Sequence, residues 1–115
     1  MSVYLIADIT VTNGGWVPDY AAHVHHIVAR HGGTYLSRSG NITTLEGPQS
    51  DSTLIAILKF PTRAAVESFA ADPDYAPFGR ARQAGSHSRF TLIDDTDIVG
   101  TIAYLPKGPT AAASA

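Results

Sequence analysis

The sequence predicts an α+β domain with the element order strand–helix–strand–strand–helix–strand around one four-stranded antiparallel sheet. Three observations lead to this fold class. Segments rich in branched aliphatic residues alternate with segments whose hydrophobic residues recur every three or four positions. Glycine and proline separate these segments, and one strand is apolar on both faces. This order is the split βαβ arrangement of a ferredoxin-like domain, with both helices on one face of the sheet.

The first half of the chain predicts a strand, a helix and two extended segments. Residues 3–11 (VYLIADITV) are rich in Val and Ile and end at an Asn-Gly-Gly breaker. Residues 16–31 change to a helical period, with Pro18 in the first turn and Gly32-Gly33 at the end. The predicted hydrophobic stripe contains Val17, Tyr20, Val24, Ile27 and Val28. Residues 34–39 and 42–46 are predicted to be extended, with a bend or bulge at Gly40-Asn41 between them.

The second half predicts a strand, a helix, a short helix and a closing strand. Residues 53–60 (TLIAILKF) have the strongest strand pattern, and Thr62 is expected to cap the next helix. The buried stripe of that helix is predicted to contain Val66, Phe69 and Ala70, and Asp72-Pro73 ends it. A short helix over 75–84 and a strand over 88–94 follow. Residues 98–105 could add another strand, which leaves one domain over 1–105 and a disordered tail over 106–115.

The strand over 53–60 has apolar side chains on both faces. Ile55 and Ile57 lie on one parity, and Leu54, Ala56, Leu58 and Phe60 lie on the other. A strand that is apolar on both faces is typically buried on both. One chain of 115 residues has too few elements to cover both faces, so the sequence predicts a homodimer that packs sheet against sheet.

Composition excludes several classes of function. The formal charge of −2 gives no drive toward nucleic acid or an anionic membrane, and the absence of cysteine excludes disulfides and thiolate chemistry. The apolar start of the chain is short, lacks a basic region and is interrupted by Asp8, which argues against a signal peptide or a membrane span and favours the cytoplasm. No phosphate-binding glycine loop, Gly-x-Ser-x-Gly elbow or dinucleotide fingerprint occurs, so we expect no cofactor.

Several motifs in this element order resemble a known family. They are Tyr20, then Gly32-Gly33-Thr34-Tyr35-Leu36-Ser37-Arg38, Leu45-Glu46-Gly47, Phe60-Pro61 and Asp72-Pro73-Asp74-Tyr75. Together with the closing strand over 88–94, they resemble the DUF1330 group of the dimeric α/β-barrel superfamily over roughly residues 3 to 95. Two features depart from the family: His31 stands where an aromatic residue is common, and the chain continues after Asp95.

The resemblance implies a fold and a dimer, but it does not identify a reaction. Wider relatives include cofactor-free monooxygenases, muconolactone-type isomerases, polyketide cyclases, haem-degrading enzymes and stress-response proteins. Arg38 matches an arginine of the family, which implies a role for its guanidinium at a ligand. The segment after Asp95 could exchange across the dimer or close a pocket.

Four of the 5 histidines lie within residues 22–33 (AHVHHIVARHGG). At 100° per residue His23 lies at the edge of the hydrophobic stripe and His31 lies within it, while His25 and His26 point elsewhere. Only His23 and His26 are close enough to share an ion, because His31 lies about 12 Å from His23 along the axis. We therefore expect no metal site, and a structural role for His31 near the negative end of the helix dipole.

The candidate site residues are His23, Arg38, Tyr20, Asp8 and His87. His23 would act as general acid or base, and Arg38 would stabilise an enolate or carboxylate. Tyr20 would donate a hydrogen bond, with Asp8 or His87 completing the group. Three of them have a structural alternative: His23 at the rim of the helix, Arg38 in an ion pair with Glu46, and Asp8 paired with an arginine or placed at a strand end.

Two functions fit these residues. One is a cofactor-independent enzyme that acts on a hydrophobic, oxygenated small molecule by acid–base chemistry, as an isomerase, cyclase or lyase or as a cofactor-free monooxygenase. Its cleft would lie between the first helix and the sheet, with walls from Val24, Ile27, Leu36 and Phe69. The other is a dimeric binding or stress-related module without chemistry of its own.

Overall fold

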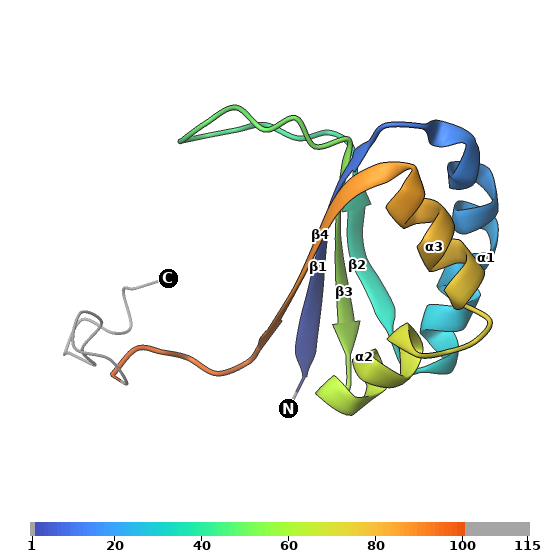
Figure 1. Cartoon of the computed structure of the whole chain (residues 1–115). Coiled ribbons are helices and arrows are strands. Elements are labelled where there is room, and N and C mark those ends of the chain that lie inside the picture. The colour runs from blue at the N-terminus through green and yellow to red at the C-terminus, as the bar shows by residue number, and fades with distance from the viewer. Residues whose placement is uncertain (1, 101–115) are drawn as a thin grey trace.

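In the computed structural model, which describes residues 2–100, the helices pack against one face of a four-stranded sheet (Figure 1). The elements in chain order are β1 (Val3–Val11), the 3-10 helix η1 (Gly14–Trp16), α1 (Val17–Arg30), β2 (Thr34–Ser39), β3 (Leu54–Phe60), α2 (Arg63–Ala70), α3 (Ala76–Ala84) and β4 (Ser86–Asp94). The order β-α-β-β-α-β is confirmed, with α3 as an additional short helix before the last strand.

The sheet has the strand order β2-β3-β1-β4, and every neighbouring pair is antiparallel. β1 occupies a central position, where Ala7 lies opposite Ala56 of β3 and Phe90 of β4. This is the ferredoxin-like topology that the sequence predicts, and it places β2 and β4 at the two edges of the sheet.

The hydrophobic core lies between the helices and one face of the sheet. Alternate residues of β1 and β3 are buried on this face, because successive side chains of a strand point to opposite sides. They pack with the buried stripe of α1 and with α2, as the helical spacing predicts. The core contains Val3, Leu5, Ala7, Ile9, Val24, Ile27, Val28, Ala56, Leu58, Phe60, Val66, Phe69 and Tyr75.

Local signals fix the ends of the first two long helices. Gly32 follows α1 with φ +80°, a conformation that favours glycine, so the predicted helix end is confirmed. A Cβ at Gly33 would lie 2.6 Å from Val28 and 2.7 Å from Phe60, so glycine allows the chain to pass close to the core. The Thr62 hydroxyl accepts a hydrogen bond from the Ala65 amide at 3.1 Å and caps α2 as expected.

Four local expectations need correction. Residues 42–46 form no strand and belong to the loop between β2 and β3. The expected bend at Gly40 is present, and a further irregularity lies inside β2, where the register shifts between Tyr35 and Ser37. Ala70 is exposed, and β4 begins at Ser86 rather than at residue 88. Residues 98–100 are not a strand, and the rest of the expected final strand and tail lies outside the described residues.

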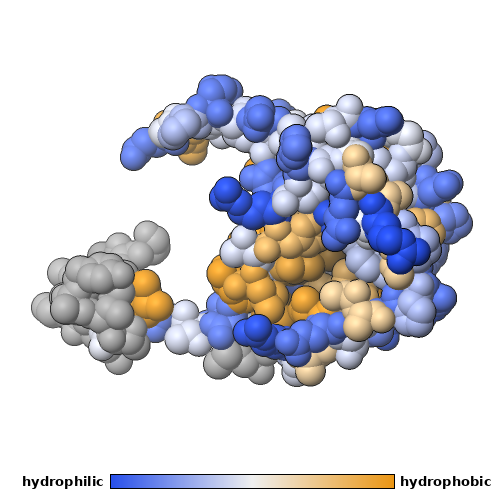
Figure 2. Space-filling view, in the orientation of Figure 1, coloured by the Kyte–Doolittle hydropathy of each residue, from blue (hydrophilic) through white to orange (hydrophobic). Residues whose placement is uncertain are grey.

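Two segments extend from the sheet toward the side opposite the helices (Figure 1). One is the loop of residues 40–53 between β2 and β3, and the other follows β4 after Asp94. The loop carries Leu45 with 94% of its surface exposed. Figure 2 shows a hollow in the middle of the same view, where hydrophobic residues gather inside a hydrophilic rim. The molecule therefore has a concave outline between these two segments.

Candidate functional site

A cavity of about 680 Å³ lies between the first turns of α1 and the helix-facing side of the sheet. Strands β1 and β3 supply most of its floor, including Leu5, Ala7 and Leu58, and Phe69 of α2 closes one side. Its volume is typical of small-molecule sites, and its walls are largely aliphatic and aromatic. The cleft predicted between the first helix and the sheet therefore exists. Of its four predicted wall residues only Phe69 lines it, because Val24 and Ile27 are core residues and Leu36 is exposed.

Trp16 covers part of this cavity from η1. Its indole Nε1 donates a hydrogen bond to the Gly85 carbonyl at 3.1 Å, which ties the cover to the end of α3. A Cβ at Gly85 would lie 2.4 Å from Cδ1 of Trp16, so the indole packs directly against backbone. The Asn13 side chain accepts a hydrogen bond from the Gly15 amide at 3.2 Å and so caps η1. Trp16 is thus held in place from both sides of the short helix.

Tyr20 supplies a hydroxyl group to the wall of the cavity. Its oxygen lies 2.8 Å from the hydroxyl oxygen of Tyr75, and either group can be the donor. Burial raises the pKa of Tyr20 strongly, and the neighbouring Tyr75 raises this pKa further. The Tyr20 hydroxyl is therefore protonated at neutral pH, and it offers a hydrogen bond rather than a base.

Arg38 is the one cation among the residues that line the cavity in the described part of the chain. Its guanidinium carbon lies 4.6 Å from the centre of the Tyr35 ring. Burial raises the pKa of Tyr35, and the charge of Arg38 opposes this effect. The alternative ion pair with Glu46 is not among the ion pairs of residues 2–100. The Arg38 guanidinium is therefore available to a ligand oxygen.

Asp8 and His87 lie on the opposite face of the sheet from this cavity. Ala7 and Ile9 point into the cavity wall, so the alternate residue Asp8 points away from it. Asp8 lies opposite Arg89 of β4, and its carboxylate accepts a hydrogen bond from the Ser52 hydroxyl. His87 lies opposite Thr10 on that same face. The structure therefore does not bring Asp8 or His87 together with Tyr20 and Arg38.

His23 also lies outside the cavity wall. Its side chain is exposed, and its ring centroid lies 5.7 Å from that of Phe78 on α3. His25 and His26 stack on each other with ring centroids 3.9 Å apart. Within the described residues no three His, Cys, Asp or Glu side chains form a group that could hold a metal ion. Of the predicted residues, Tyr20 and Arg38 are the two that line the cavity.

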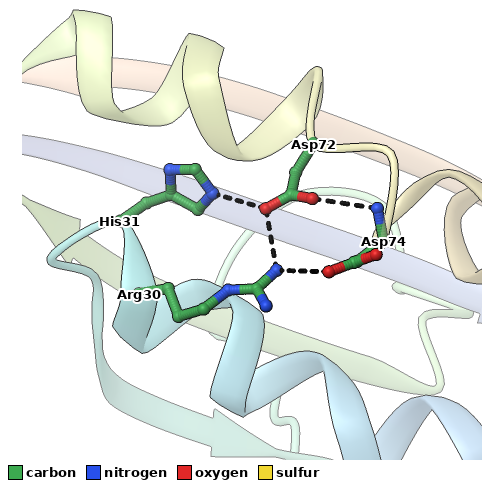
Figure 3. A network of polar contacts seen from close by, with 4 residues as sticks. All are labelled: Arg30, His31, Asp72 and Asp74. Atoms are coloured by element: carbon green, nitrogen blue, oxygen red, sulfur yellow. Dashed lines mark hydrogen bonds and ion pairs between the residues drawn. The ribbon is translucent and has the colours of Figure 1, made fainter.

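His31 joins the end of α1 to the turn between α2 and α3 (Figure 3). Its Nε2 lies 2.8 Å from Oδ2 of Asp72, and Arg30 reaches the same oxygen at 2.9 Å and Asp74 at 3.0 Å. The hydrogen bond from His31 is the largest of the effects that lower the pKa of Asp72 to about 2. This network is structural, in keeping with the position of His31 at the helix end.

Comparison with known proteins identifies the family. The sequence profile described as "Domain of unknown function (DUF1330)" matches residues 2–96. The chain belongs to the DUF1330 family. No curated protein matches the sequence. No helix within residues 2–100 has the length and hydropathy needed to cross a bilayer.

Solved structures of the same fold come from several bacteria. A protein of unknown function from Rhodopseudomonas palustris, RPA0582, is 18% identical with a TM-score of 0.73, over 84% of this chain and 83% of that one. A DABB-family protein with a ferredoxin-like fold from Mesorhizobium loti is 15% identical with a TM-score of 0.63, over 84% and 98%. SnoaB, a cofactor-independent oxygenase from Streptomyces nogalater, is 21% identical with a TM-score of 0.59, over 84% and 94%. At these identities the similarity establishes the fold alone.

Sequence reasoning missed the aromatic residues Trp16, Tyr35 and Phe90 in the cavity wall, and Tyr75 as the partner of Tyr20. Trp16 covers part of the cavity, and the Tyr35 ring makes a cation–π contact with Arg38. The hydroxyl of Tyr75 is hydrogen-bonded to that of Tyr20. Trp16 carried a usable signal, because a single tryptophan beside the Gly-Gly breaker is an unusual choice for an exposed turn. Tyr35 and Tyr75 carried no such signal, because their partners lie far away in the sequence.

Proposed function

We propose that this protein is a cofactor-independent enzyme that acts on a hydrophobic, oxygen-bearing small molecule by acid–base chemistry. One observation carries the proposal: a largely apolar cavity of about 680 Å³ holds a guanidinium group and a buried tyrosine hydroxyl in its wall. The sequence lacks the motifs that bind nucleotides or flavins. The fold that it shares with a cofactor-independent oxygenase gives additional support.

The chemistry assigned to the cavity is the stabilisation of an oxyanion. Isomerisation, cyclisation, lyase and oxygenation reactions of a carbonyl compound can each begin with loss of a proton beside the carbonyl, which leaves an enolate. Arg38 would neutralise that charge, and Tyr20 would donate a hydrogen bond to the same oxygen. Removing one such donor typically lowers turnover by about 10²–10³-fold. The proton itself would pass to water, because no carboxylate or imidazole of the described residues lines the cavity.

The same absence of a base in the wall favours a second candidate, a binding module without turnover. Trp16, Tyr20 and Arg38 would then hold a hydrophobic ligand by packing, a hydrogen bond and charge. A stress-related role would follow from sequestering such a ligand. The two functions differ only in whether the bound molecule is converted, so a single experiment separates them.

We further propose that the protein is a homodimer that packs through the open face of the sheet. That face carries the alternate residues of the central strands, including Ile6, Ile55 and Ile57, and none of the described helices covers it (Figure 1). Ile93 on the edge strand β4 adds a further apolar side chain, 52% exposed. The loop of residues 40–53 extends toward the same side, where a second copy would meet it. The cavity would remain accessible, because it lies on the other face.

Anthrone is a suitable probe because it is apolar and forms an enolate. Its oxidation by dioxygen converts the CH₂ group to a carbonyl, with one oxygen atom entering the product and the other leaving as water. Binding would quench Trp16, the one tryptophan of the chain, and turnover would appear as anthraquinone absorbance and oxygen uptake. Arg38→Ala and Tyr20→Phe should each lower turnover at least tenfold (roughly 1.4 kcal/mol) while the fold persists by circular dichroism.

The matched control is His26→Ala, an exposed imidazole on the same helix as Tyr20, which should leave turnover unchanged. His23→Ala tests the role that the sequence assigned to it, and a tenfold loss there would place the chemistry outside this cavity. Saturable quenching of the Trp16 fluorescence without turnover of anthrone would favour the binding module over the enzyme. If anthrone neither quenches Trp16 nor reacts, the cavity does not serve this class of molecule.

A further inference from the structure

Arg82 on α3 is a buried cation without a counter-charge. The residue is 6% exposed, and its Nε has no hydrogen-bond partner. No ion pair within the described residues includes it, and its one aromatic contact is with Phe90, whose ring centre lies 4.3 Å from the guanidinium carbon. Burying a guanidinium away from water is strongly unfavourable unless an anion compensates its charge.

The surrounding sequence does not supply that anion. Residues 75–93, which span α3 and nearly all of β4, contain Arg80, Arg82 and Arg89 and no aspartate or glutamate. The nearest acidic residues along the chain are Asp74 and Asp94. Asp74 pairs with Arg30, so its charge is already engaged. The positive charge around Arg82 is therefore uncompensated locally.

A polar cleft of about 470 Å³ opens beside Arg82. Gln83, His87 and Ser88 line it together with Arg82, and Phe90 separates it from the apolar cavity, to which it also contributes. This cleft lies at the point where α3 passes into the edge strand β4. It is thus a second concave site, distinct in its polar lining from the cavity that holds Tyr20 and Arg38.

Two serine hydroxyls fix the geometry of this cleft. Ser86 Oγ donates to the Arg82 carbonyl at 2.6 Å, and it lies 2.6 Å from Ser88 Oγ. Because the Ser86 proton is engaged at the carbonyl, Ser88 is the donor of the second bond. Both hydroxyl protons are then committed to the protein. The donors left for a ligand are the Arg82 guanidinium and the Gln83 amide.

We propose that the cleft beside Arg82 binds an oxyanion, the carboxylate or phosphate group of a small molecule. A guanidinium matches the geometry of both groups by offering parallel N–H donors. The Phe90 ring supports the planar guanidinium from one side, and Gln83 lines the same cleft and can bond a remaining oxygen. The proposal does not depend on the enzymatic function, because Arg82 does not line the apolar cavity.

The test is a titration of the full-length protein with sodium acetate and with inorganic phosphate, against sodium chloride at equal ionic strength. The Nε–H resonance of Arg82 in ¹H–¹⁵N spectra should shift saturably with at least one of the two anions and not with chloride. The same anion should raise the melting temperature. Acetate alone would assign a carboxylate ligand, and phosphate alone would assign a phosphate ligand.

Matched variants locate the effect. Arg82→Met should weaken the anion response at least tenfold, whereas Arg80→Met, an exposed arginine on the same helix, should keep it. Arg82→Lys retains the charge but loses the planar fork, and it should bind more weakly than wild type. Without anion, the melting temperature of Arg82→Met should be equal to or above that of wild type, because an unpaired buried charge has been removed.

Two results would overturn the proposal. The first is a wild-type Arg82 resonance that shows no saturable shift with either anion at millimolar concentration. The second is a response that survives in Arg82→Met or disappears equally in Arg80→Met. If Arg82→Met does not fold, Arg82→Lys and Gln83→Ala take its place, and an unchanged anion response in both would equally refute the site. A dimer that dissociates in Arg82→Met without any anion effect would show a carboxylate of the second copy in the cleft instead.

Discussion

Strand β3 is apolar on both faces of the sheet, but the two faces have different surroundings. On one face, α1, α2 and α3 bury alternate residues of β1 and β3 and leave the cavity beside Tyr20. On the other face, Ile6, Ile55 and Ile57 lie at equivalent depth in the strands, and the described helices leave them uncovered (Figure 1). The comparison shows that hydrophobicity identifies a strand without identifying its core side. In the proposed homodimer, the second copy would cover this face.

The largest expected effect tests the helix-covered face. Phe60 is completely buried there, whereas its neighbour Lys59 points to the open face and is exposed. Phe60→Ala should lower the free energy of unfolding by about 3–5 kcal/mol, because it leaves a large cavity in the core. Lys59→Ala should change it by less than about 0.5 kcal/mol. Urea unfolding measures both, and equal losses would mean that the two faces are not distinct in this way.

The next effect tests the open face through the proposed dimer. Ile57→Lys places a charge at the centre of that face and should weaken dimerisation at least a hundredfold, or about 2.7 kcal/mol, with circular dichroism unchanged. Ala29→Lys is the control, since Ala29 is exposed on α1 on the other side of the sheet. Sedimentation equilibrium measures the dissociation constant of the dimer for both variants. A wild-type protein that is monomeric at micromolar concentration would refute the dimer before any variant is made.

A smaller effect should appear where the covered face opens into the cavity. In Gly85→Ala the added Cβ would meet Trp16 at 2.4 Å, so the indole must move. We expect a loss of about 1–3 kcal/mol of stability, a red-shifted tryptophan emission and weaker anthrone binding. Gly14 lines the same cavity, but a Cβ added there would have its nearest contact at 4.0 Å. Gly14→Ala should therefore change the stability and the tryptophan emission little. An unshifted emission in Gly85→Ala would show that Trp16 is not held as described.

The smallest effect concerns the edge of the helix layer, where Asp72 joins α1 to the turn between α2 and α3. Its pKa is about 2 in the folded protein and 3.8 as an ordinary reference, so its ionised form favours folding. This contribution is present above about pH 4 and is lost as the pH falls toward 2. Asp72→Asn should flatten the dependence of the urea midpoint on pH in that window. Asp51→Asn, an exposed carboxylate in the loop, should retain it. Identical profiles for both variants would contradict the role of the network.

Much of the fold was predictable because its signals are local. The bounds of β1 follow from its Val and Ile residues and the glycines after it, and β2 begins directly after Gly32-Gly33. Thr62 marks the start of α2 by its capping side chain. The extended loop of residues 40–53 was less accessible, because whether a β-prone segment such as 42–46 joins a sheet depends on a free neighbouring strand. That information is global, and here residues 42–46 lie in a loop that extends away from the sheet (Figure 1).

The candidate site was only partly predictable, for reasons of geometry. Tyr20 and Arg38 are placed in the cavity wall, but His23 turns toward Phe78 because α3 packs beside α1. Asp8 was grouped with them as a carboxylate in a central strand, and His87 because the last strand lies beside the first. Without the side on which the helices pack, a strand residue cannot be assigned to a face. The cavity roles of these residues remain predictions until the variants are measured.

The hydroxyl pair of Tyr20 and Tyr75 allows Tyr20 to act toward a ligand either as a hydrogen-bond donor or as an acceptor. Because either oxygen can be the donor across their 2.8 Å contact, the polarity of the pair can reverse without any heavy atom moving. When Tyr75 donates, the Tyr20 proton is free to meet a ketone oxygen. When Tyr20 donates, its lone pairs can accept the proton of an enol or phenol. One fixed wall can thus receive a keto compound and its enol tautomer at the same position.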